Sequence, residues 1–203
     1  MKIAIIGATG NVGSRIVDEA LSRGQHVTAI SRHTARLSPH ENLTFVNADA
    51  MDPEQLANAL QGHDVVISAI KFQQVEPESL IEAVRRSGVE RYLVVGGAGS
   101  LEVAPGRALV DSQGFPALYR DEALAGKAFL DALRKTNNLD WTMLSPSALF
   151  TAGERTGVFR LGNDSLLTAA DGKSSISFED FAIALLNEVE HPQHLRKRFT
   201  VGY

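Results

Sequence analysis

The feature that most constrains how this chain folds is a glycine triplet close to its N-terminus. Gly7, Gly10 and Gly13 are spaced G-x-x-G-x-x-G, after a β-branched run at residues 3–6 and before an amphipathic segment at 11–23. A glycine-rich turn that binds nothing would have the same residues. A triplet placed between a strand and a helix, however, is typical of the first β-α unit of a dinucleotide-binding fold. We therefore expect a phosphate-binding loop at this position.

Each residue type in this loop has a physical role in holding a dinucleotide. One glycine makes the tight turn, a second lets the backbone approach the pyrophosphate, and a third lets the helix and the strand pack closely. The N-terminus of the helix then offers amide donors and a partial positive charge to the phosphates. The loop residues expected to contact the cofactor are Gly7, Thr9, Gly10, Asn11, Val12 and Gly13.

Short apolar runs and helical patterns alternate along the whole chain. Runs that are apolar on both faces, as in strands buried on both sides of a parallel sheet, occupy residues 3–6, 26–30, 43–46, 65–70, 92–95, 141–144 and 199–201. Amphipathic segments predict helices at 11–23, 77–87, 121–135 and 178–189, and a further helix that Asp52 begins and Gly62 ends. This order predicts an α/β Rossmann fold, which is a doubly wound parallel sheet with helices on both faces.

The C-terminal third is expected to add a small cap over the carboxyl edge of the sheet. Residues 147–176 are rich in Gly, Ser and Thr, which predicts loops and a short hairpin. Ser177 and Asp180 have the spacing of a capping box at the start of the last helix. No linker is evident, so we expect one domain over residues 1–203, with its substrate side formed mostly by 99–120 and 147–176.

Composition excludes several classes of function. The 203 residues contain no cysteine, which excludes a disulfide scaffold and a thiolate metal site. His191 and His194 have no acidic cluster near them in the sequence, so no metal site is expected. Twenty Lys and Arg against 24 Asp and Glu disfavour binding to nucleic acid through phosphates. The apolar runs are too short to cross a membrane or to form a signal peptide, so we expect a cytoplasmic protein.

The residues after the second predicted strand bear on the choice of nucleotide. A site that prefers NAD usually has an acidic residue here, which bonds the ribose 2′-hydroxyl. This chain has Ser31 and Arg32 instead, and a guanidinium can bond the 2′-phosphate of NADP. We therefore expect NADP(H), with NAD(H) less favoured, unless Arg32 is only a solvated surface residue. Asp49, after the third strand, either touches the adenine or caps a turn.

The carboxyl ends of the other predicted strands supply more candidates, because ligands bind at that edge of a parallel sheet. Residues that follow or end these strands, and that we expect at the cofactor, are Ala69, Ile70, Lys71, Gly96, Gly97, Ser145 and Pro146. Phe72 follows Lys71 and is expected at the same edge.

Taken together, the glycine loop, Ser31-Arg32, the segment 94–100 and the C-terminal segments 139–146, 153–157 and 175–182 resemble the atypical short-chain dehydrogenases/reductases. Within them, the chain is similar to the NAD(P)H-flavin reductase group, which is related to biliverdin/flavin reductases and to NmrA-like and isoflavone-reductase-like proteins. The resemblance covers essentially the whole chain. It implies a Rossmann fold and NADP(H) binding, and it implies a substrate more weakly.

The chain lacks the Tyr-x-x-x-Lys dyad of typical short-chain dehydrogenases, in which the lysine lowers the pKa of a proton-donating tyrosine. Four residues after Tyr92 stands Gly96, four after Tyr119 stands Ala123, and Tyr203 ends the sequence. Reduction of a flavin or quinone can proceed without the dyad, because solvent can deliver the proton. We therefore expect an NADPH-dependent reductase of flavin- or quinone-like small molecules, with flavin as substrate rather than prosthetic group. A non-catalytic NADP(H) sensor of the NmrA type and a sugar-nucleotide epimerase or dehydratase are the alternatives.

Two residues are candidates for acid or orienting roles. Lys127 resembles the helix lysine of isoflavone-reductase-like proteins, which contacts the nicotinamide ribose or assists proton transfer. Tyr119 is expected in a loop that crosses the cofactor, just before the helix at 121–135. The alternatives are an exposed helix lysine for Lys127 and a packing aromatic for Tyr119.

Overall fold

The computed structural model describes residues 1–32 and 37–203, and these residues are built around one large sheet. Its eight strands lie in the order β10-β12-β8-β5-β4-β1-β2-β3, and all the neighbouring pairs are parallel except β10 with β12. The strands of the sheet are β1 (Lys2–Ile6), β2 (His26–Ile30), β3 (Leu43–Val46), β4 (Val65–Ser68), β5 (Arg91–Val95), β8 (Asp140–Pro146), β10 (Arg160–Gly162) and β12 (Lys197–Gly202). The order β3-β2-β1-β4-β5-β8 is that of a doubly wound dinucleotide-binding sheet, which confirms the predicted Rossmann-like α/β fold.

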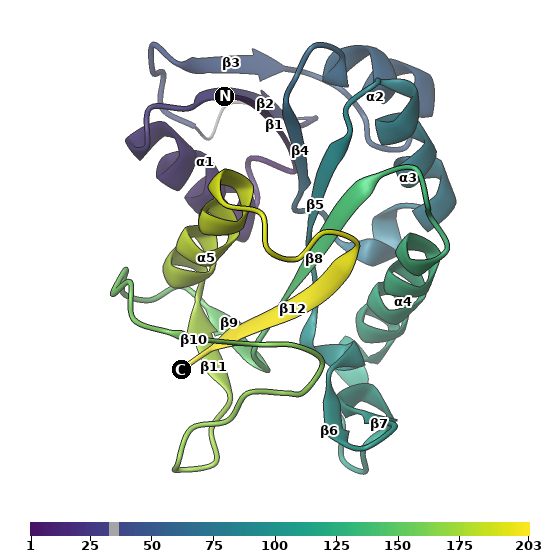
Figure 1. Cartoon of the computed structure of the whole chain (residues 1–203), viewed down its shortest axis with the longest axis vertical. Coiled ribbons are helices and arrows are strands. Elements are labelled where there is room, and N and C mark those ends of the chain that lie inside the picture. Colours follow the sequence, from purple (N-terminus) through teal and green to yellow (C-terminus); the bar gives the residue numbers. More distant parts are fainter. Residues whose placement is uncertain (33–36) are drawn as a thin grey trace.

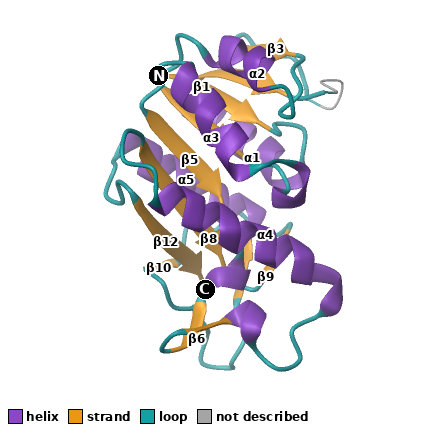
Figure 2. Ribbon diagram, turned by 90° about the vertical axis from the view of Figure 1, so that its right-hand side faces the viewer, coloured by secondary structure: helices purple, strands orange, loops and turns teal. Residues whose placement is uncertain are grey.

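Helices cover both faces of the sheet (Figure 1). One face is covered by α1 (Asn11–Ser22) and α5 (Phe178–Glu190), and the other by α2 (Pro53–Leu60), α3 (Pro77–Arg86) and α4 (Ala117–Arg134). A separate apolar core lies between the sheet and each helix layer. Figure 2 is turned so that the second of these layers faces the viewer, with α4 lying in front of the strands. Because both faces are covered, the strands are apolar on both sides, which is why their sequence signal is continuous rather than alternating.

Two helices begin with the side-chain N-caps that their sequences predict. The side chain of Asp52 caps α2 and accepts hydrogen bonds from the amides of Glu54 and Gln55. At α5, the Ser177 hydroxyl accepts a hydrogen bond from the Asp180 amide at 3.0 Å. The reciprocal half of the expected capping box is absent from this helix start, because the Asp180 carboxylate instead bonds residues of a distant loop.

Helix α4 begins at Ala117, four residues before the start that its charge pattern predicts. Pro116 is the N-cap, with an extended backbone (φ −61°, ψ 124°), and the residues after it all tolerate a helix. The expectation that Tyr119 lies in a loop before the helix is therefore wrong, because Tyr119 belongs to the first turn of α4.

The cap differs from the expected short hairpin. Strands β9 (Leu149–Thr151) and β11 (Ser175–Ser177) pair in parallel, while β10 joins the edge of the main sheet. A small hairpin of β6 (Glu102–Ala104) and β7 (Arg107–Ala108) also forms. The short 3-10 turns are η1 (Phe72–Gln74), η2 (Ala98–Ser100) and η3 (Leu109–Asp111). Both small sheets lie beyond the carboxyl ends of β5 and β8 (Figure 1).

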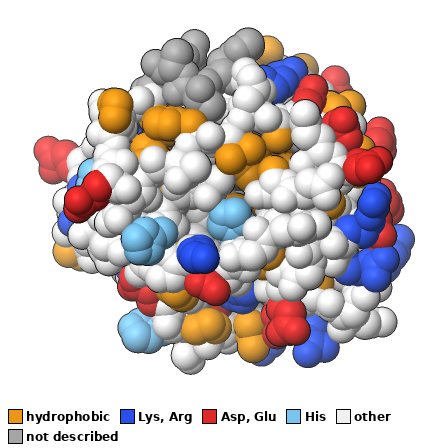
Figure 3. Space-filling view, turned by 90° about the horizontal axis from the view of Figure 1, so that it is seen from above, with side chains coloured by type: hydrophobic (Ala, Val, Ile, Leu, Met, Phe, Trp, Pro, Cys, Tyr) orange, Lys and Arg blue, Asp and Glu red, His pale blue; other side chains and the backbone are white. Residues whose placement is uncertain are grey.

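No helix among residues 1–32 and 37–203 has the length and apolar character needed to cross a membrane. On the face shown in Figure 3, acidic and basic side chains are interspersed rather than separated by sign.

Candidate functional site

The candidate site lies where the direction of winding of the sheet reverses, between β1 and β4. Ile6 pairs with Ile30 of β2 on one side and with Ser68 of β4 on the other, so these strands end level with one another. The loops that follow them therefore meet: the Gly7 amide donates to the Ile30 carbonyl at 2.9 Å, and the Ala69 amide donates to the Ile6 carbonyl at 2.8 Å. A crevice at such a reversal is the usual ligand site of an open α/β sheet.

The three glycines of the loop have different structural roles. Gly7 has a φ of +80°, and a Cβ there would lie 2.6 Å from the Ala69 carbonyl oxygen. A Cβ at Gly13 would lie 2.1 Å from the Gly7 carbonyl oxygen, so this glycine lets α1 pack against the loop. Gly10 is exposed, and the nearest atom to a Cβ there is the Gly7 oxygen at 3.2 Å. Gly10 is therefore the position at which a bound group can approach the backbone.

Helix α1 begins directly after Gly10, with its N-terminus facing the loop. Its N-cap is Gly10, no side chain caps its first amides, and its first turn contains no acidic residue. Free amides and the positive end of the helix dipole are the donor set that phosphate groups require. These features, together with the space over Gly10, fit the pyrophosphate of a dinucleotide.

A groove of about 520 Å³ runs from this loop along the carboxyl edge of the sheet. Nine of the residues expected at the cofactor line it: Gly7, Thr9, Gly10, Ser31, Arg32, Asp49, Ala69, Ile70 and Lys71. Asn11, Val12 and Gly13 begin α1 behind the loop and are not among its lining residues. The groove also has lining residues that the sequence did not indicate, among them Met51, Gln73, Gln74 and Val75.

The end of the groove next to β2 contains the residues that bear on the choice of nucleotide. Arg32 is exposed and lines the groove, so its guanidinium is accessible to a ligand there. The Ser31 hydroxyl is 2.8 Å from the Thr9 hydroxyl, which links the second strand to the glycine loop. Asp49 accepts a hydrogen bond from the Met51 amide at 3.0 Å and also lines the groove. Asp49 therefore caps the turn that follows β3. It also lies at the groove, so the contact with the adenine that the sequence suggested stays a prediction.

A second cavity, of about 470 Å³, adjoins the groove. It lies between the carboxyl end of β5 and the N-terminal end of α4. Its walls are mostly apolar and include Gly96, Gly97, Phe72, Phe115, Leu109 and Tyr119. Among its lining residues, all of them within the described part of the chain, Glu122 is the one charged side chain. Of the two segments expected on the substrate side, 99–120 provides much of this wall, whereas 147–176 provides only Ala148.

The structure separates the two residues predicted to act as acid or orienting group. Tyr119 lines the second cavity and is 61% exposed. Lys127 lines neither cavity, and its Nζ pairs with Asp111 at 3.2 Å on the surface. Ser145 and Pro146 are buried in β8 and line neither cavity; a Cβ on Gly96 would lie 3.0 Å from the Ser145 hydroxyl.

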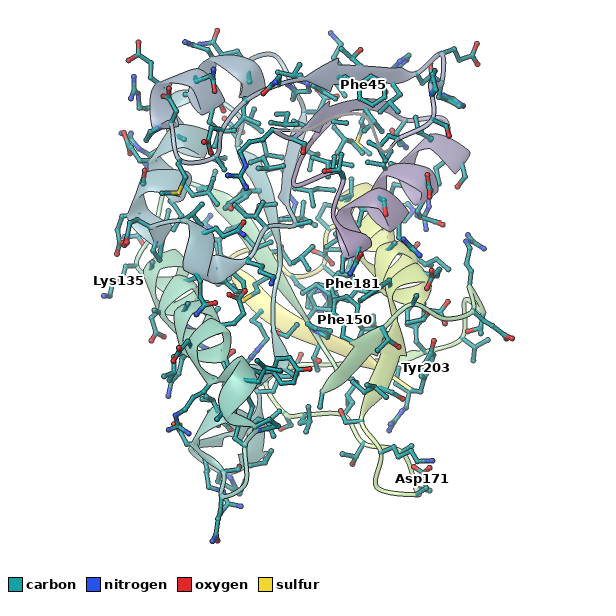
Figure 4. All side chains as sticks on the ribbon, turned by 180° about the vertical axis from the view of Figure 1, so that it is seen from behind. Phe45, Lys135, Phe150, Asp171, Phe181 and Tyr203 are labelled. Atoms are coloured by element: carbon teal, nitrogen blue, oxygen red, sulfur yellow. The ribbon has the colours of Figure 1, made fainter. Side chains whose placement is uncertain are left out.

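Two of the segments on which the family resemblance rests, 153–157 and 175–182, come together in the structure. The Asp180 carboxylate accepts hydrogen bonds from the Thr156 hydroxyl at 2.5 Å, the Gly157 amide at 2.8 Å and the Tyr203 hydroxyl at 2.9 Å. Figure 4 shows Tyr203 near Phe150 and Phe181, whose ring centroids are 4.8 Å apart. These segments therefore hold the cap on the sheet, and they do not line the groove or the adjoining cavity.

Two residues of this cap attachment have shifted pKa values. Burial raises the pKa of the Asp180 carboxyl, but the hydrogen bonds from Thr156, Gly157 and Tyr203 outweigh burial and hold that pKa below its ordinary value. Burial likewise opposes ionisation of Glu19, and the paired Arg155 and Arg23 hold its pKa low. Arg155 lies in the 153–157 loop, so this pair ties the same loop to α1.

Glu122 and Phe115 line the second cavity although the sequence analysis did not single them out. Glu122 lies four and seven residues before Gly126 and Phe129, which are buried. The sequence could have indicated Glu122, because an acidic residue on the apolar stripe of a helix is unusual. Phe115 lies in an irregular segment without a periodic pattern, so its position depends on the tertiary fold.

A Rossmann-like sheet with an open phosphate loop at the reversal point defines a dinucleotide-binding protein. The chain belongs to the NAD(P)H-binding family, whose model matches residues 7–192. This membership confirms the resemblance drawn from the sequence. The groove at the glycine loop is thus the candidate NAD(P)H site.

Three solved structures are similar to this one over its whole length. A protein of Burkholderia pseudomallei is 45% identical, with all of both chains covered and a TM-score of 0.91. One of Bacteroides thetaiotaomicron is 40% identical over 100% of this chain and 96% of its own, with a TM-score of 0.95. One of Streptococcus pneumoniae is 36% identical over 100% and 99%, with a TM-score of 0.87. They are described, in that order, as an exported protein, an epimerase and an NADH-flavin reductase, and all three descriptions are provisional.

Proposed function

We propose that the protein is an NADPH-dependent reductase that transfers hydride to a flavin- or quinone-like small molecule. The observation that carries the proposal is the apolar cavity next to the dinucleotide groove. A reductase needs a second ring-sized space beside the nicotinamide, whereas a sensor that only binds the nucleotide does not. The description of the Streptococcus pneumoniae protein as an NADH-flavin reductase supports the flavin acceptor, while the choice of NADPH rests on Arg32.

This reaction requires no acid or base side chain of the protein. The bound nucleotide would supply a hydride to an acceptor that is already electrophilic, and one proton from solvent or from a nearby hydroxyl would complete the reduction. The chain then has to bind two rings next to each other, orient them and exclude water. The missing Tyr-x-x-x-Lys dyad is compatible with this reaction, and it disfavours the epimerase reading.

The charge of the acceptor cavity narrows the proposed substrate class. Its charged lining residue, Glu122, is negative, and the described lining residues include no cation. An acceptor that carries its own phosphate would gain no partner there and would be repelled by the carboxylate. We propose that neutral acceptors are preferred.

The test is an NADPH-oxidation assay with purified protein, in which the absorbance of NADPH is followed in the presence of riboflavin, FMN, a neutral quinone and a small aldehyde. Catalysed oxidation with riboflavin or the quinone, above the rate without protein, supports the proposal. A higher kcat/KM for FMN than for riboflavin would contradict the charge argument. Tight NADPH binding with no turnover on any acceptor would favour the NADP(H) sensor of the NmrA type.

Arg32→Ala should weaken NADPH binding by roughly 10- to 150-fold and leave NADH binding within about twofold. The reason is that only NADPH carries the 2′-phosphate, and a hydrogen bond to a charged group contributes about 1.5–3 kcal/mol. Fluorescence titration of both nucleotides measures the two dissociation constants. The matched control is Arg86→Ala, which removes an exposed arginine of α3. Wild-type protein that binds NADH as tightly as NADPH would refute the proposed preference.

Tyr119→Phe should lower turnover by less than ~10²-fold with the best acceptor, because ~10² is the lower bound for removing a general acid. Tyr119 lines the cavity and is exposed, so water can reach the same place and replace it as proton source. Steady-state kinetics with a separate NADPH titration measure the effect. A thousandfold fall in turnover with binding intact would identify Tyr119 as the proton donor and favour a carbonyl reductase. Lys127→Ala, measured alongside, tests the ribose-binding role suggested for that lysine.

We propose that residues 1–203 form one NAD(P)-binding domain that acts in the cytoplasm on a small-molecule partner, without a nucleic-acid or membrane partner. Fractionation of cells expressing the chain tests the compartment directly.

A further inference from the structure

The turn η1 forms the wall between the dinucleotide groove and the acceptor cavity. Lys71, Gln73 and Gln74 line the groove, whereas Phe72 between them lines the cavity. One short segment of backbone therefore sets the shape of both spaces. Its conformation has to be held by contacts from outside, because a single 3-10 turn is not stable by itself.

Glu122 of α4 holds the backbone of this wall. Its Oε1 accepts a hydrogen bond from the Phe72 amide at 2.8 Å, and its Oε2 accepts one from the Gln73 amide at 3.1 Å. These are the first two amides of η1, and the N-cap residue Lys71 provides no side-chain cap. The carboxylate of a distant helix thus satisfies the amides that a short helix leaves without partners.

The same face of α4 supports the Phe72 ring. A Cβ on Gly126 would lie 2.9 Å from that ring, and the centroid of the Phe129 ring is 5.2 Å from that of Phe72. Glu122, Gly126 and Phe129 are spaced so that they lie on one face of α4. Together they form the surface against which η1 packs. The wall is fixed through its backbone by the carboxylate and through its side chain by packing.

We propose that Glu122 is a positioning residue for both ligands. It acts through η1, holding the residues that face the nucleotide and the ring that faces the acceptor. The inference rests on the proposed function only in that a dinucleotide occupies the groove and an acceptor the cavity. Loss of the carboxylate lets η1 move, which weakens the binding of both the nucleotide and the acceptor. The groups that react are unchanged.

The test compares Glu122→Gln with Asp121→Asn, which makes the same change of charge at an exposed neighbouring position of α4. Glutamine has the length of glutamate but only one accepting oxygen for the two amides. Glu122→Gln is expected to raise the NADPH dissociation constant and the acceptor KM about tenfold each, with kcat at saturation changed less than about threefold. Asp121→Asn is expected to leave all three values unchanged.

Hydrogen exchange followed by mass spectrometry gives a readout independent of activity. Peptides covering residues 70–76 should exchange faster in Glu122→Gln without nucleotide, while peptides from β1 and β5 remain protected. If Glu122→Gln does not fold, Glu122→Asp, which withdraws both oxygens by one methylene, should shift exchange and NADPH affinity in the same direction.

The outcomes separate this inference from the proposed function. Unchanged NADPH affinity in a folded Glu122→Gln variant would overturn the positioning role, even if the wild type reduces flavins or quinones. A lower melting temperature with unchanged NADPH affinity would likewise show a purely structural role. Weaker NADPH binding and faster exchange at 70–76 would support the role even if none of the tested acceptors were reduced.

Discussion

Gly10→Val is expected to raise the dissociation constant for NADPH at least about a hundredfold while the protein stays folded. The valine side chain would occupy the space over the loop where the pyrophosphate approaches the backbone and the open N-terminus of α1. Loss of two hydrogen bonds to charged phosphate oxygens, at about 1.5 kcal/mol each, already gives this factor. The φ of Gly10 is −72°, so an L-residue fits the backbone there.

A fluorescence titration with NADPH and a thermal unfolding curve measure the two parts of this expectation. Valine caps a helix less well than glycine, so stability should fall by about 1 kcal/mol, or roughly 2–4 °C for a chain of this size. Ala128→Val is the matched control, because it adds bulk at an exposed position of α4 outside both cavities. Gly13→Val, by contrast, should damage the fold, since its Cβ would lie 2.1 Å from the Gly7 oxygen. A folded Gly10→Val protein with unchanged affinity would refute the phosphate loop.

The main sheet was predictable because its strands are buried on both faces. Runs such as β1 and β4 are apolar at every inner position, and the amphipathic helices between them leave a parallel sheet as the arrangement that buries both. The small sheets were not predictable. Strands β9 and β11 have three residues each and pair across the loops between them, so neither a period of two nor a local turn identifies them.

The candidate site was predictable to the extent that topology determines it. Parallel strands bring the loops after β1, β2, β3 and β4 to one edge, and residues chosen there from the sequence line the groove. The acceptor cavity depends on details that topology does not determine. Its wall includes the irregular segment 112–116 and the first turn of α4, whose start is set by Pro116. Glu122 stands out in the sequence only as an acidic residue on the apolar stripe of α4, and only the fold brings η1 against it.

Asp180→Ala is expected to lower the free energy of unfolding by at least about 3 kcal/mol at neutral pH. The carboxylate is buried, and it accepts hydrogen bonds from Thr156, Gly157 and Tyr203. Alanine would leave these donors without their acceptor and would weaken the attachment of the 153–157 loop to α5, where the bond from the Gly153 amide to Glu179 remains. Two hydrogen bonds to a charged group at about 1.5 kcal/mol each give the lower limit. Urea unfolding followed by circular dichroism measures the difference from the wild type.

The pH dependence of this difference identifies its cause. The pKa of Asp180 is lowered in the folded protein from its ordinary value of 3.8, so its stabilising contribution is complete above that value. The contribution is lost as the pH falls below 3.8 towards the depressed folded pKa, and the gap between wild type and Asp180→Ala should narrow there. Asp121→Ala, at an exposed position, should cost less than about 0.5 kcal/mol at any pH. If Asp180→Ala does not fold, Tyr203→Phe removes one donor and should cost about 1.5 kcal/mol with the same acid dependence. A gap that stays constant down to pH values well below 3.8 would mean that lost packing, and not the ionised carboxylate, accounts for the destabilisation.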